Sequence, residues 1–209
     1  MGSKPLIHII DDDEAVRQAL EFSLRSAQME VRSYDSATAF LRALPAIEAG
    51  CIVTDVRMPD ITGIELLKRL KDLQVGLPVI VVTGHGDVPL AVEAMKMGAV
   101  DFLEKPFDDD VLLTSVKSAL GRWQEAASRH AERSALQERL ASLSNRERDV
   151  LDGLVAGRAN KTIAYDLGIS PRTVEVYRAN VMTKMQAASL SELVRMALIA
   201  GVVHSPGAD

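Results

Sequence analysis

Acidic side chains follow two short apolar runs of the sequence. Asp11 and Asp12 come directly after residues 6–10, and Asp55 ends the run 51–54. Short apolar runs rich in β-branched residues predict buried strands. Carboxylates at the carboxyl ends of neighbouring parallel strands share one crevice, where they repel one another unless a cation or a base neutralises them. Such hard oxygen ligands suit Mg²⁺, so the sequence predicts a magnesium site.

Two further polar side chains end predicted strands. Thr83 closes the run 78–83, and Lys105 follows the run 100–104. A carboxylate nucleophile, a metal, an ammonium and a hydroxyl around one cavity are the parts that accept and hold a phosphoryl group. Taken singly, each of these side chains also has a purely structural interpretation. For Asp55, a cap of the next helix explains the residue as well as a role in phosphoryl chemistry does. The combination of side chains at several strand ends favours phosphoryl chemistry.

The elements that must position these side chains alternate between strands and helices. Each predicted strand precedes apolar residues at helical spacing, and the strands lie at 6–10, 31–34, 51–54, 78–83 and 100–104. This alternation predicts an α/β doubly wound sheet of the flavodoxin-like type, with five parallel strands in the order 2-1-3-4-5 and five helices. Strands 1 and 3 are then neighbours, which brings the carboxylates of Asp11, Asp12 and Asp55 together.

Charge is uneven along the 209 residues. Residues 1–120 hold 12 basic against 19 acidic residues, a net charge of −7 that suits a cation site, whereas residues 144–209 hold 8 against 7, a net charge of +1. A nearly neutral segment is weak support for a nucleic-acid partner, so local pattern must decide. No run of about 18 apolar residues and no secretory signal is present. We therefore expect a cytoplasmic protein with no membrane segment.

Residues 121–143 almost lack helix breakers. Leu136, Leu140 and Leu143 form a stripe at helical spacing, and the stretch 128–135 is polar and weakly patterned. The pattern predicts a helical connector that is either continuous or broken in this stretch. A coiled-coil dimer is the alternative, although the seam is shorter than the sustained heptads that such a dimer needs.

Helix signals continue to the end of the chain. Ser144 and Glu147 have the spacing of a capping box, and Ser170 followed by Pro171 is a strong helix start. A tight turn at Gly168 joins two of the four predicted helices. Two helices joined in this way, the second with polar groups on its outer face, suit insertion into the major groove of DNA. A plain helical bundle is the alternative that spacing alone leaves open.

Motifs in the first 120 residues carry a family resemblance. The chain resembles a two-component response-regulator receiver domain over roughly residues 5–120 in four motifs: Ile9-Ile10-Asp11-Asp12, Asp55-Val56-Arg57-Met58-Pro59-Asp60, Thr83-Gly84-His85 and Lys105-Pro106-Phe107. The resemblance implies that Asp55 takes phosphate from a partner histidine kinase. It also implies that Asp12, Asp55 and the Arg57 carbonyl hold Mg²⁺, with Asp11 acting mainly through water.

The same resemblance assigns three further roles. Lys105 pairs with the phosphate, and its peptide bond to Pro106 is expected to be cis. Thr83 and Phe102 fill the switch positions of the family. Because Phe102 lacks the hydroxyl of the Tyr that relatives often have there, it provides no hydrogen bond. The chain is then not an enzyme beyond its own aspartyl phosphorylation and dephosphorylation.

The chain from about residue 143 to its end resembles a LuxR-type helix-turn-helix domain. The resemblance lies in Leu143-Ser144-Asn145-Arg146-Glu147, Asn160-Lys161-Thr162-Ile163-Ala164 and Ile169-Ser170-Pro171-Arg172-Thr173-Val174-Glu175. Glu175 stands where many relatives have Lys, so their base readout is not transferable. Asn160, at the start of the second helix, belongs to the DNA-binding motif. The phosphate candidates are Lys161, Arg172, Arg178 and Lys184, and the base-edge candidates are Thr173, Glu175, Val176 and Ala179.

Together with Gly84-His85-Gly86-Asp87-Val88-Pro89, these motifs make the chain similar to the NarL/FixJ group of response regulators. We expect a receiver domain at 1–120, a helical linker at 121–143 and a DNA-binding domain at 144–209. The group implies a transcription activator of nitrogen-fixation genes, phosphorylated by a FixL-like oxygen-sensing histidine kinase. Phosphorylation would drive homodimerisation through the helix 4–strand 5 face and release the DNA-binding domain.

Promoter double-stranded DNA and RNA polymerase are the further partners that the group implies. Two rival classes remain open from the residues. One is a phosphoprotein phosphatase or an enzyme-output regulator, for which residues 144–209 contain one His and no Cys. The other is an RNA-binding or protein-docking output, because the helical domain is only mildly basic.

Overall fold

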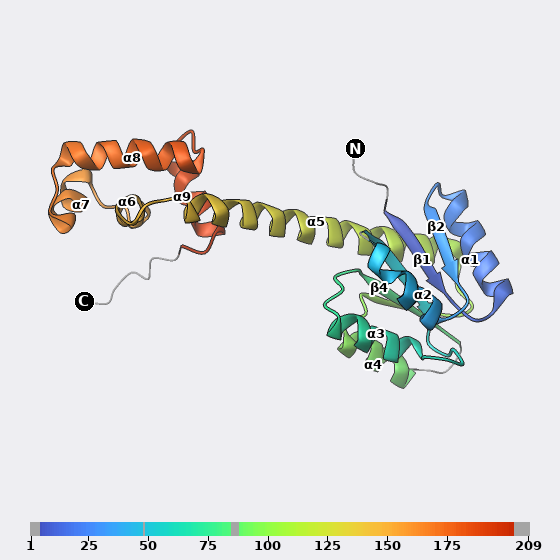
Figure 1. Ribbon diagram of the computed structural model, residues 1–209. Coiled ribbons are helices and arrows are strands. Elements are labelled where there is room, and N and C mark those ends of the chain that lie inside the picture. Colours follow the sequence, from blue (N-terminus) through green and yellow to red (C-terminus); the bar gives the residue numbers. More distant parts are fainter. Residues whose placement is uncertain (1–4, 48, 85–87, 203–209) are drawn as a thin grey trace. The chain divides into compact units, whose positions relative to one another are not determined.

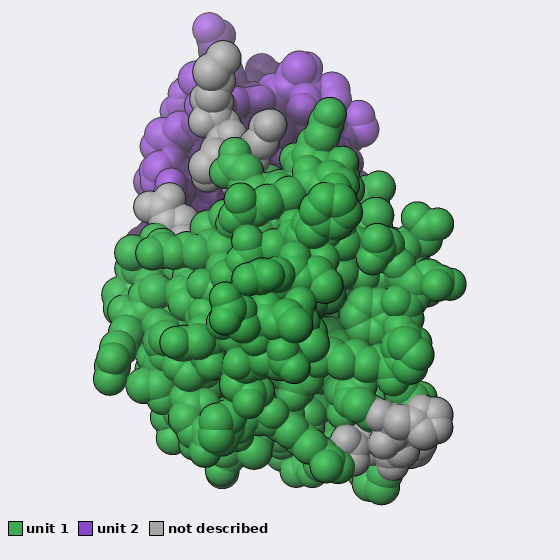
Figure 2. Space-filling view, turned by 90° about the vertical axis from the view of Figure 1, so that its right-hand side faces the viewer, with its two compact units in different colours: residues 1–125 green, residues 126–209 purple. Residues whose placement is uncertain are grey.

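A computed structural model describes residues 5–47, 49–84 and 88–202 (Figure 1). The chain divides into two compact units, residues 1–125 and residues 126–209, which are coloured green and purple in Figure 2. The division falls inside one long helix, α5 (Asp109–Ala141). In the described residues α5 has no break at 128–135, so of the two connector geometries the structure has the continuous one.

The first unit is built on a five-stranded parallel sheet in the order β2-β1-β3-β4-β5. This confirms the predicted fold class and strand order. In β3 only the terminal Asp55 escapes full burial, as expected for a central strand covered on both faces. The strands are β1 (Leu6–Ile10), β2 (Glu30–Tyr34), β3 (Gly50–Asp55), β4 (Val79–Thr83) and β5 (Asp101–Glu104).

Helices cover both faces of this sheet and make two apolar cores. Phe40, Leu66 and Ala94 belong to the core that α2, α3 and α4 share with the sheet. Leu24 and Val116 belong to the core that α1 and α5 form on the opposite face. The helices of this unit other than α5 are α1 (Glu14–Ser26), α2 (Ala37–Ala43), a 3-10 turn (Leu44–Ala46), α3 (Gly63–Asp72) and α4 (Val88–Met97).

Side-chain caps start the helices that follow β1 and β3. Asp13 accepts hydrogen bonds from the first-turn amides of α1, which confirms a helix start in the acidic run. Thr62 and Glu65 form a capping box at α3. Because Thr62 and not Asp55 caps this helix, the interpretation of Asp55 as a helix cap is wrong, and its carboxylate is available for another role.

The second unit packs four helices against the end of α5. These are α6 (Asn145–Val155), α7 (Asn160–Leu167), α8 (Pro171–Met185) and α9 (Leu190–Ile199). Leu136, Leu140 and Leu143 of the predicted connector stripe are buried in the core of this unit. Gly168 ends α7 in the left-handed conformation, which glycine adopts without steric cost. The predicted starts at Ser144 and Ser170 are both confirmed.

Two helices bury some apolar residues and expose or half-bury their neighbours. On α9, Leu198 is 56% exposed, whereas Met196 is buried. On α5, Leu112 and Ala119 are buried, and their apolar neighbours Leu113 and Leu120 are only partly buried. Among the described residues, no helix is both long and apolar enough to cross a membrane.

His8 lies inside the first unit, fully buried on β1. Its Nδ1 is 3.2 Å from the Tyr34 hydroxyl, its ring packs against Phe40, and its Nε2 has no hydrogen-bond partner. Burial, helped by the charge of Arg32, lowers the pKa of His8 from 6.5 to about 4. The histidine is therefore a neutral core residue at neutral pH.

We predict that His8 makes the protein less stable in acid. Because the unfolded chain binds this proton at a higher pH than the folded chain, stability is lost as the pH falls from 6.5 towards 4, by about 3 kcal/mol. Chemical denaturation of the wild type and His8→Phe across this range measures the difference. The exposed His130 gives the matched control His130→Gln, which keeps the wild-type dependence; an equal dependence in His8→Phe would contradict the prediction.

Candidate functional site

Three of the predicted side chains meet at the carboxyl end of the sheet. Asp11 follows β1, Asp55 ends β3 and Lys105 follows β5. The Lys105 ammonium Nζ donates hydrogen bonds to Asp11 Oδ2 at 2.8 Å and to Asp55 Oδ1 at 2.7 Å. The side chains are 26% exposed for Lys105, 3% for Asp11 and 11% for Asp55. The Lys105 ammonium thus neutralises Asp11 and Asp55, the two less exposed of the three carboxylates predicted to share this site.

The electrostatics of this cluster balance burial against pairing. Burial raises the pKa of Asp55, and its hydrogen bonds to Lys105 and Arg57 offset only part of that effect. Burial opposes the charge of Lys105, but the bonds to Asp11 and Asp55 outweigh it and raise the pKa of the ammonium. The site therefore holds a charged Lys105 beside a basic carboxylate that is still open to solvent, which is suited to attack on an electrophilic phosphorus.

The loop after β3 fixes the Asp55 carboxylate from its other side. The Arg57 amide donates to Asp55 Oδ2 at 2.5 Å. The Gly63 amide donates to the Val56 carbonyl at 2.9 Å, which brings the start of α3 against the end of β3. A Cβ atom at Gly63 would lie 2.3 Å from the Asp55 carbonyl oxygen, so only glycine fits this approach.

The turn after β1 is held by a residue that sequence reasoning missed. The Arg17 guanidinium on α1 donates to the carbonyl oxygens of Asp11 at 2.7 Å and of Asp12 at 2.9 Å. The Asp13 amide donates to Asp11 Oδ1 at 2.9 Å. Arg17 lies one turn into an ordinary helix, and nothing in its spacing distinguishes it from a solvent-exposed cation.

The oxygen donors of the predicted metal site fit a hard divalent cation by their chemistry. Three carboxylates and a backbone carbonyl are what Mg²⁺ prefers. In the described part of the chain, however, no three acidic, histidine or cysteine side chains gather around one point at metal-binding distance. The Lys105 ammonium lies between Asp11 and Asp55, and Asp12 is exposed.

The two switch candidates lie on the neighbouring strands. Thr83 is 1% exposed at the end of β4, and its carbonyl accepts a hydrogen bond from the Lys105 amide at 2.7 Å. The peptide bond from Lys105 to Pro106 is cis, as expected. His85 of the motif lies outside the described residues. A hollow of about 590 Å³ over α4 and β5 is lined by Ala91, Val92, Met95, Lys96, Asp101 and Phe102.

Most of the DNA candidates occur on the accessible side of α8. Arg172, Glu175, Val176 and Ala179 are exposed, and Val176 is 57% exposed despite its apolar side chain. The Thr173 hydroxyl lies 2.8 Å from Ser170 Oγ, which ties it to the helix start. In the helix-turn-helix arrangement that the sequence predicts, this exposed side of α8 is the one expected to face base edges.

A hollow of about 550 Å³ beside this surface includes Lys161, Glu175 and Arg178, with Asn160 at the start of α7. The residue before this helix, Ala159, has no side-chain cap, so the first amides of α7 are open to another acceptor. Amides at a helix start together with lysine and arginine side chains suit a phosphate group.

Lys184 differs from the other predicted phosphate ligands. Its ammonium lies 2.6 Å from Glu147 Oε2 and 3.2 Å from the Ser142 carbonyl oxygen. Its charge is thus engaged by acceptors of the second unit, although 39% of the side chain is exposed.

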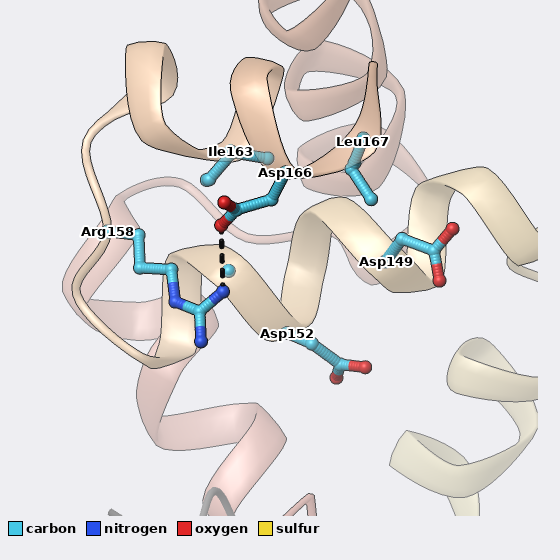
Figure 3. A pocket seen from close by; sticks show the side chains of 7 residues that line it. Asp149, Asp152, Arg158, Ile163, Asp166 and Leu167 are labelled. Atoms are coloured by element: carbon cyan, nitrogen blue, oxygen red, sulfur yellow. Dashed lines mark hydrogen bonds and ion pairs between the residues drawn. The ribbon is translucent and has the colours of Figure 1, made fainter. Parts of the chain in front are cut away.

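Figure 3 shows a smaller pocket, of about 160 Å³, between α6 and α7. Asp149 and Asp152 of α6 line it, and Arg158 pairs with Asp166 at 2.9 Å. Ile163 and Leu167 form its apolar side.

Comparisons with known proteins match both units. Residues 7–117 match the response regulator receiver domain, and residues 141–197 match the luxR family of bacterial regulatory proteins. The chain is 62% identical over 202 residues to the transcriptional regulatory protein FixJ of Azorhizobium caulinodans, covering 97% of this chain and 96% of that one. It is 58% identical over 204 residues to FixJ of Bradyrhizobium diazoefficiens, covering 98% and 100%.

Two solved structures of response regulators also match this chain along most of its length. Full-length FixJ from B. japonicum, 58% identical, covers 97% of this chain and 100% of that one, with a TM-score of 0.63. The response regulator StyR, 40% identical, covers 94% and 99%, with a TM-score of 0.84. With the same two domains in the same order along nearly its whole length, this chain belongs to the FixJ-like response regulators, transcription regulators that join a receiver to a LuxR-type DNA-binding domain.

Proposed function

We propose that the protein is a transcription activator switched by phosphorylation of Asp55. The observation that carries the proposal is the ammonium of Lys105 held between Asp11 and Asp55 at the carboxyl end of the sheet. Asp55 combines a raised pKa with contacts to both Lys105 and the Arg57 amide. The phosphoryl donor is a sensor histidine kinase of the FixL-like type.

The bound Mg²⁺ that receiver domains use would be held by Asp12, Asp55 and the Arg57 carbonyl, with Asp11 acting through water. The cation supplies charge neutralisation for the incoming phosphoryl group. Lys105 then pairs with the phosphate, since its Nζ already lies at the Asp55 oxygen that would carry it. Arg17 holds the turn that presents the two acidic residues after β1.

The signal leaves the site through Thr83 and Phe102. The Thr83 carbonyl accepts a hydrogen bond from the Lys105 amide, and Phe102 lines the hollow over α4 and β5. Exposed Val92 and Met95 make that face apolar, which supports its pairing with a second receiver. Dimerisation there releases the DNA-binding domain.

The DNA-binding domain places α8 in the major groove of promoter DNA. Arg172, Lys161 and Arg178 contact phosphates, and Thr173, Glu175, Val176 and Ala179 face base edges. The likeness to FixJ proteins supports nitrogen-fixation genes as targets, oxygen as the signal and RNA polymerase as the downstream partner in the cytoplasm. The protein catalyses nothing beyond its own aspartyl phosphorylation and dephosphorylation.

Replacing Lys105 by Met should destabilise the receiver at neutral pH. The variant leaves two poorly hydrated carboxylates without their cation, which we expect to cost about 2–3 kcal/mol. Since protonation removes the repulsion, the loss should shrink as the pH falls through the raised pKa of Asp55. Urea unfolding at pH 7 and pH 5 measures this. Lys117→Met, at an exposed position on α5, is the control; equal losses in both variants would refute the pairing.

Asp55→Asn should abolish phosphorylation. With acetyl phosphate and Mg²⁺, the wild type gains the mass of one phosphoryl group and sediments as a dimer, whereas Asp55→Asn does neither because an amide is not a nucleophile. Asp60→Asn changes an exposed carboxylate five residues away and keeps both behaviours. Intact-protein mass spectrometry and sedimentation velocity are the measurements. A phosphorylated Asp55→Asn would exclude Asp55 as the acceptor.

Lys161→Met should weaken binding to every duplex alike. Affinity falls as salt concentration rises, and loss of one phosphate contact makes the plot of log K against log salt concentration shallower by about 1 in slope. The sequence preference stays unchanged. Fluorescence anisotropy across a salt series, with a matched RNA duplex as a second ligand, measures this. Lys117→Met keeps the wild-type slope. An unchanged slope in Lys161→Met would remove that residue from the interface, and equal RNA affinity would favour an RNA-binding output.

A further inference from the structure

Four charged side chains join the end of α5 to α6 and α8, and we call them the end-cap network: Arg139, Glu147, Arg148 and Lys184. Glu147 is 4% exposed although it is a carboxylate. Its Oε2 accepts hydrogen bonds from Lys184 Nζ at 2.6 Å and from the Ser144 amide at 2.8 Å. The bond to Lys184 is the main cause of a lowered pKa at Glu147, so the carboxylate is ionised at neutral pH.

The remaining contacts of the network reach the ends of two helices. Arg148 donates to the Leu140 carbonyl at 2.9 Å, and Lys184 donates to the Ser142 carbonyl at 3.2 Å. In the reverse direction, Arg139 on α5 donates to the carbonyl of Met185, the last residue of α8, at 3.2 Å. Cations at the carbonyl ends of helices satisfy unpaired acceptors and oppose the negative end of the helix dipole.

These contacts hold the C-terminal end of α8 against the end of α5 and against α6. The core beneath them is apolar, since Leu140, Leu143, Val181 and Met185 are all buried there. Apolar packing is not directional, whereas hydrogen bonds to particular carbonyls fix the rotation and the axial position of a helix. The end-cap network therefore supplies the directional contacts between the end of α5 and the helix that reads DNA.

We propose that Lys184 is a positioning residue for DNA recognition. Through Glu147 and the Ser142 carbonyl, directly after α5, it sets where α8 lies, and it does not bind a DNA phosphate. The proposal rests on the proposed DNA surface of α8. It also makes the end of α5, the helix that begins among the receiver residues, part of the machinery that aligns the reading helix.

Salt dependence and sequence discrimination separate the two roles of Lys184. The full chain, treated with acetyl phosphate and Mg²⁺, is titrated onto a duplex that the wild type selects from random-sequence DNA and onto a scrambled duplex of the same composition. The variants are Lys184→Met, Lys184→Arg, Glu147→Gln, the double variant K184M/E147Q and Arg139→Met. Lys161→Met serves as the phosphate-contact control, and circular dichroism melting shows which variants are folded at the assay temperature.

Positioning predicts a loss of discrimination. Lys184→Met should bind the selected duplex about tenfold more weakly, a loss on the order of one mismatched base pair, while the scrambled duplex and the salt slope stay unchanged. Glu147→Gln should show the same loss, and the double variant should lose no more than either single one, because both act through one contact. Lys184→Arg keeps the charge and the donor and should retain most of the discrimination.

A direct phosphate contact predicts the opposite pattern. Lys184→Met would then lose affinity for both duplexes equally and lower the salt slope by about 1, and Glu147→Gln would bind as tightly as the wild type or more tightly because it releases the ammonium. That result would overturn the proposal. If Glu147→Gln does not fold, Lys184→Met and Arg139→Met test the proposal. Positioning requires that both lose affinity for the selected duplex while the scrambled duplex and the salt slope stay unchanged.

Failure of the proposed DNA surface has a separate signature. An unchanged salt slope in Lys161→Met would count against that surface and leave the pattern of the Lys184 variants to be judged by their own slope and discrimination.

Discussion

The receiver depends on one electrostatic constraint, the confinement of two poorly hydrated carboxylates at adjacent strand ends. Asp11 and Asp55 are compatible with the fold because the Lys105 ammonium lies between them. Each element around the site serves this arrangement: the sheet order makes β1 and β3 neighbours, β5 brings the lysine, and the cis bond to Pro106 follows directly after it. A phosphoryl group on Asp55 would change the charge that Lys105 balances, which is how a small chemical change can bias a larger rearrangement.

Close backbone approach supports the same arrangement. Gly63 allows the start of α3 to lie against the Asp55 carbonyl, and the Arg57 amide then reaches the carboxylate. On the other side Arg17 gathers the carbonyls after β1. The Asp55 carboxylate is therefore held by the Arg57 amide and the Lys105 ammonium, while Arg17 holds the neighbouring turn after β1. Contacts fixed in this way limit how much a carboxylate would have to reorganise in a reaction.

The second unit depends on a different constraint, the alignment of α8 on a small apolar core. Its apolar residues bury one face of α8, and the end-cap network adds contacts that have direction. Lys184 illustrates the point. It lies near the end of α8 and has the residue type expected of a phosphate ligand, yet its ammonium pairs with the buried carboxylate of Glu147.

Local chemistry determined much of this protein from the sequence alone. Strand and helix order followed from apolar spacing, and the starts of α6 and α8 followed from Ser144 and Ser170, because caps depend on residues only three positions apart. The convergence of Asp11, Asp55 and Lys105 also followed, since parallel strands end at one edge. Only the tertiary structure decided the partners of Arg17 and Lys184, the full burial of Leu112, and the exposed position of Asp12. Each of these depends on what another element presents at close range, which spacing along one element does not specify.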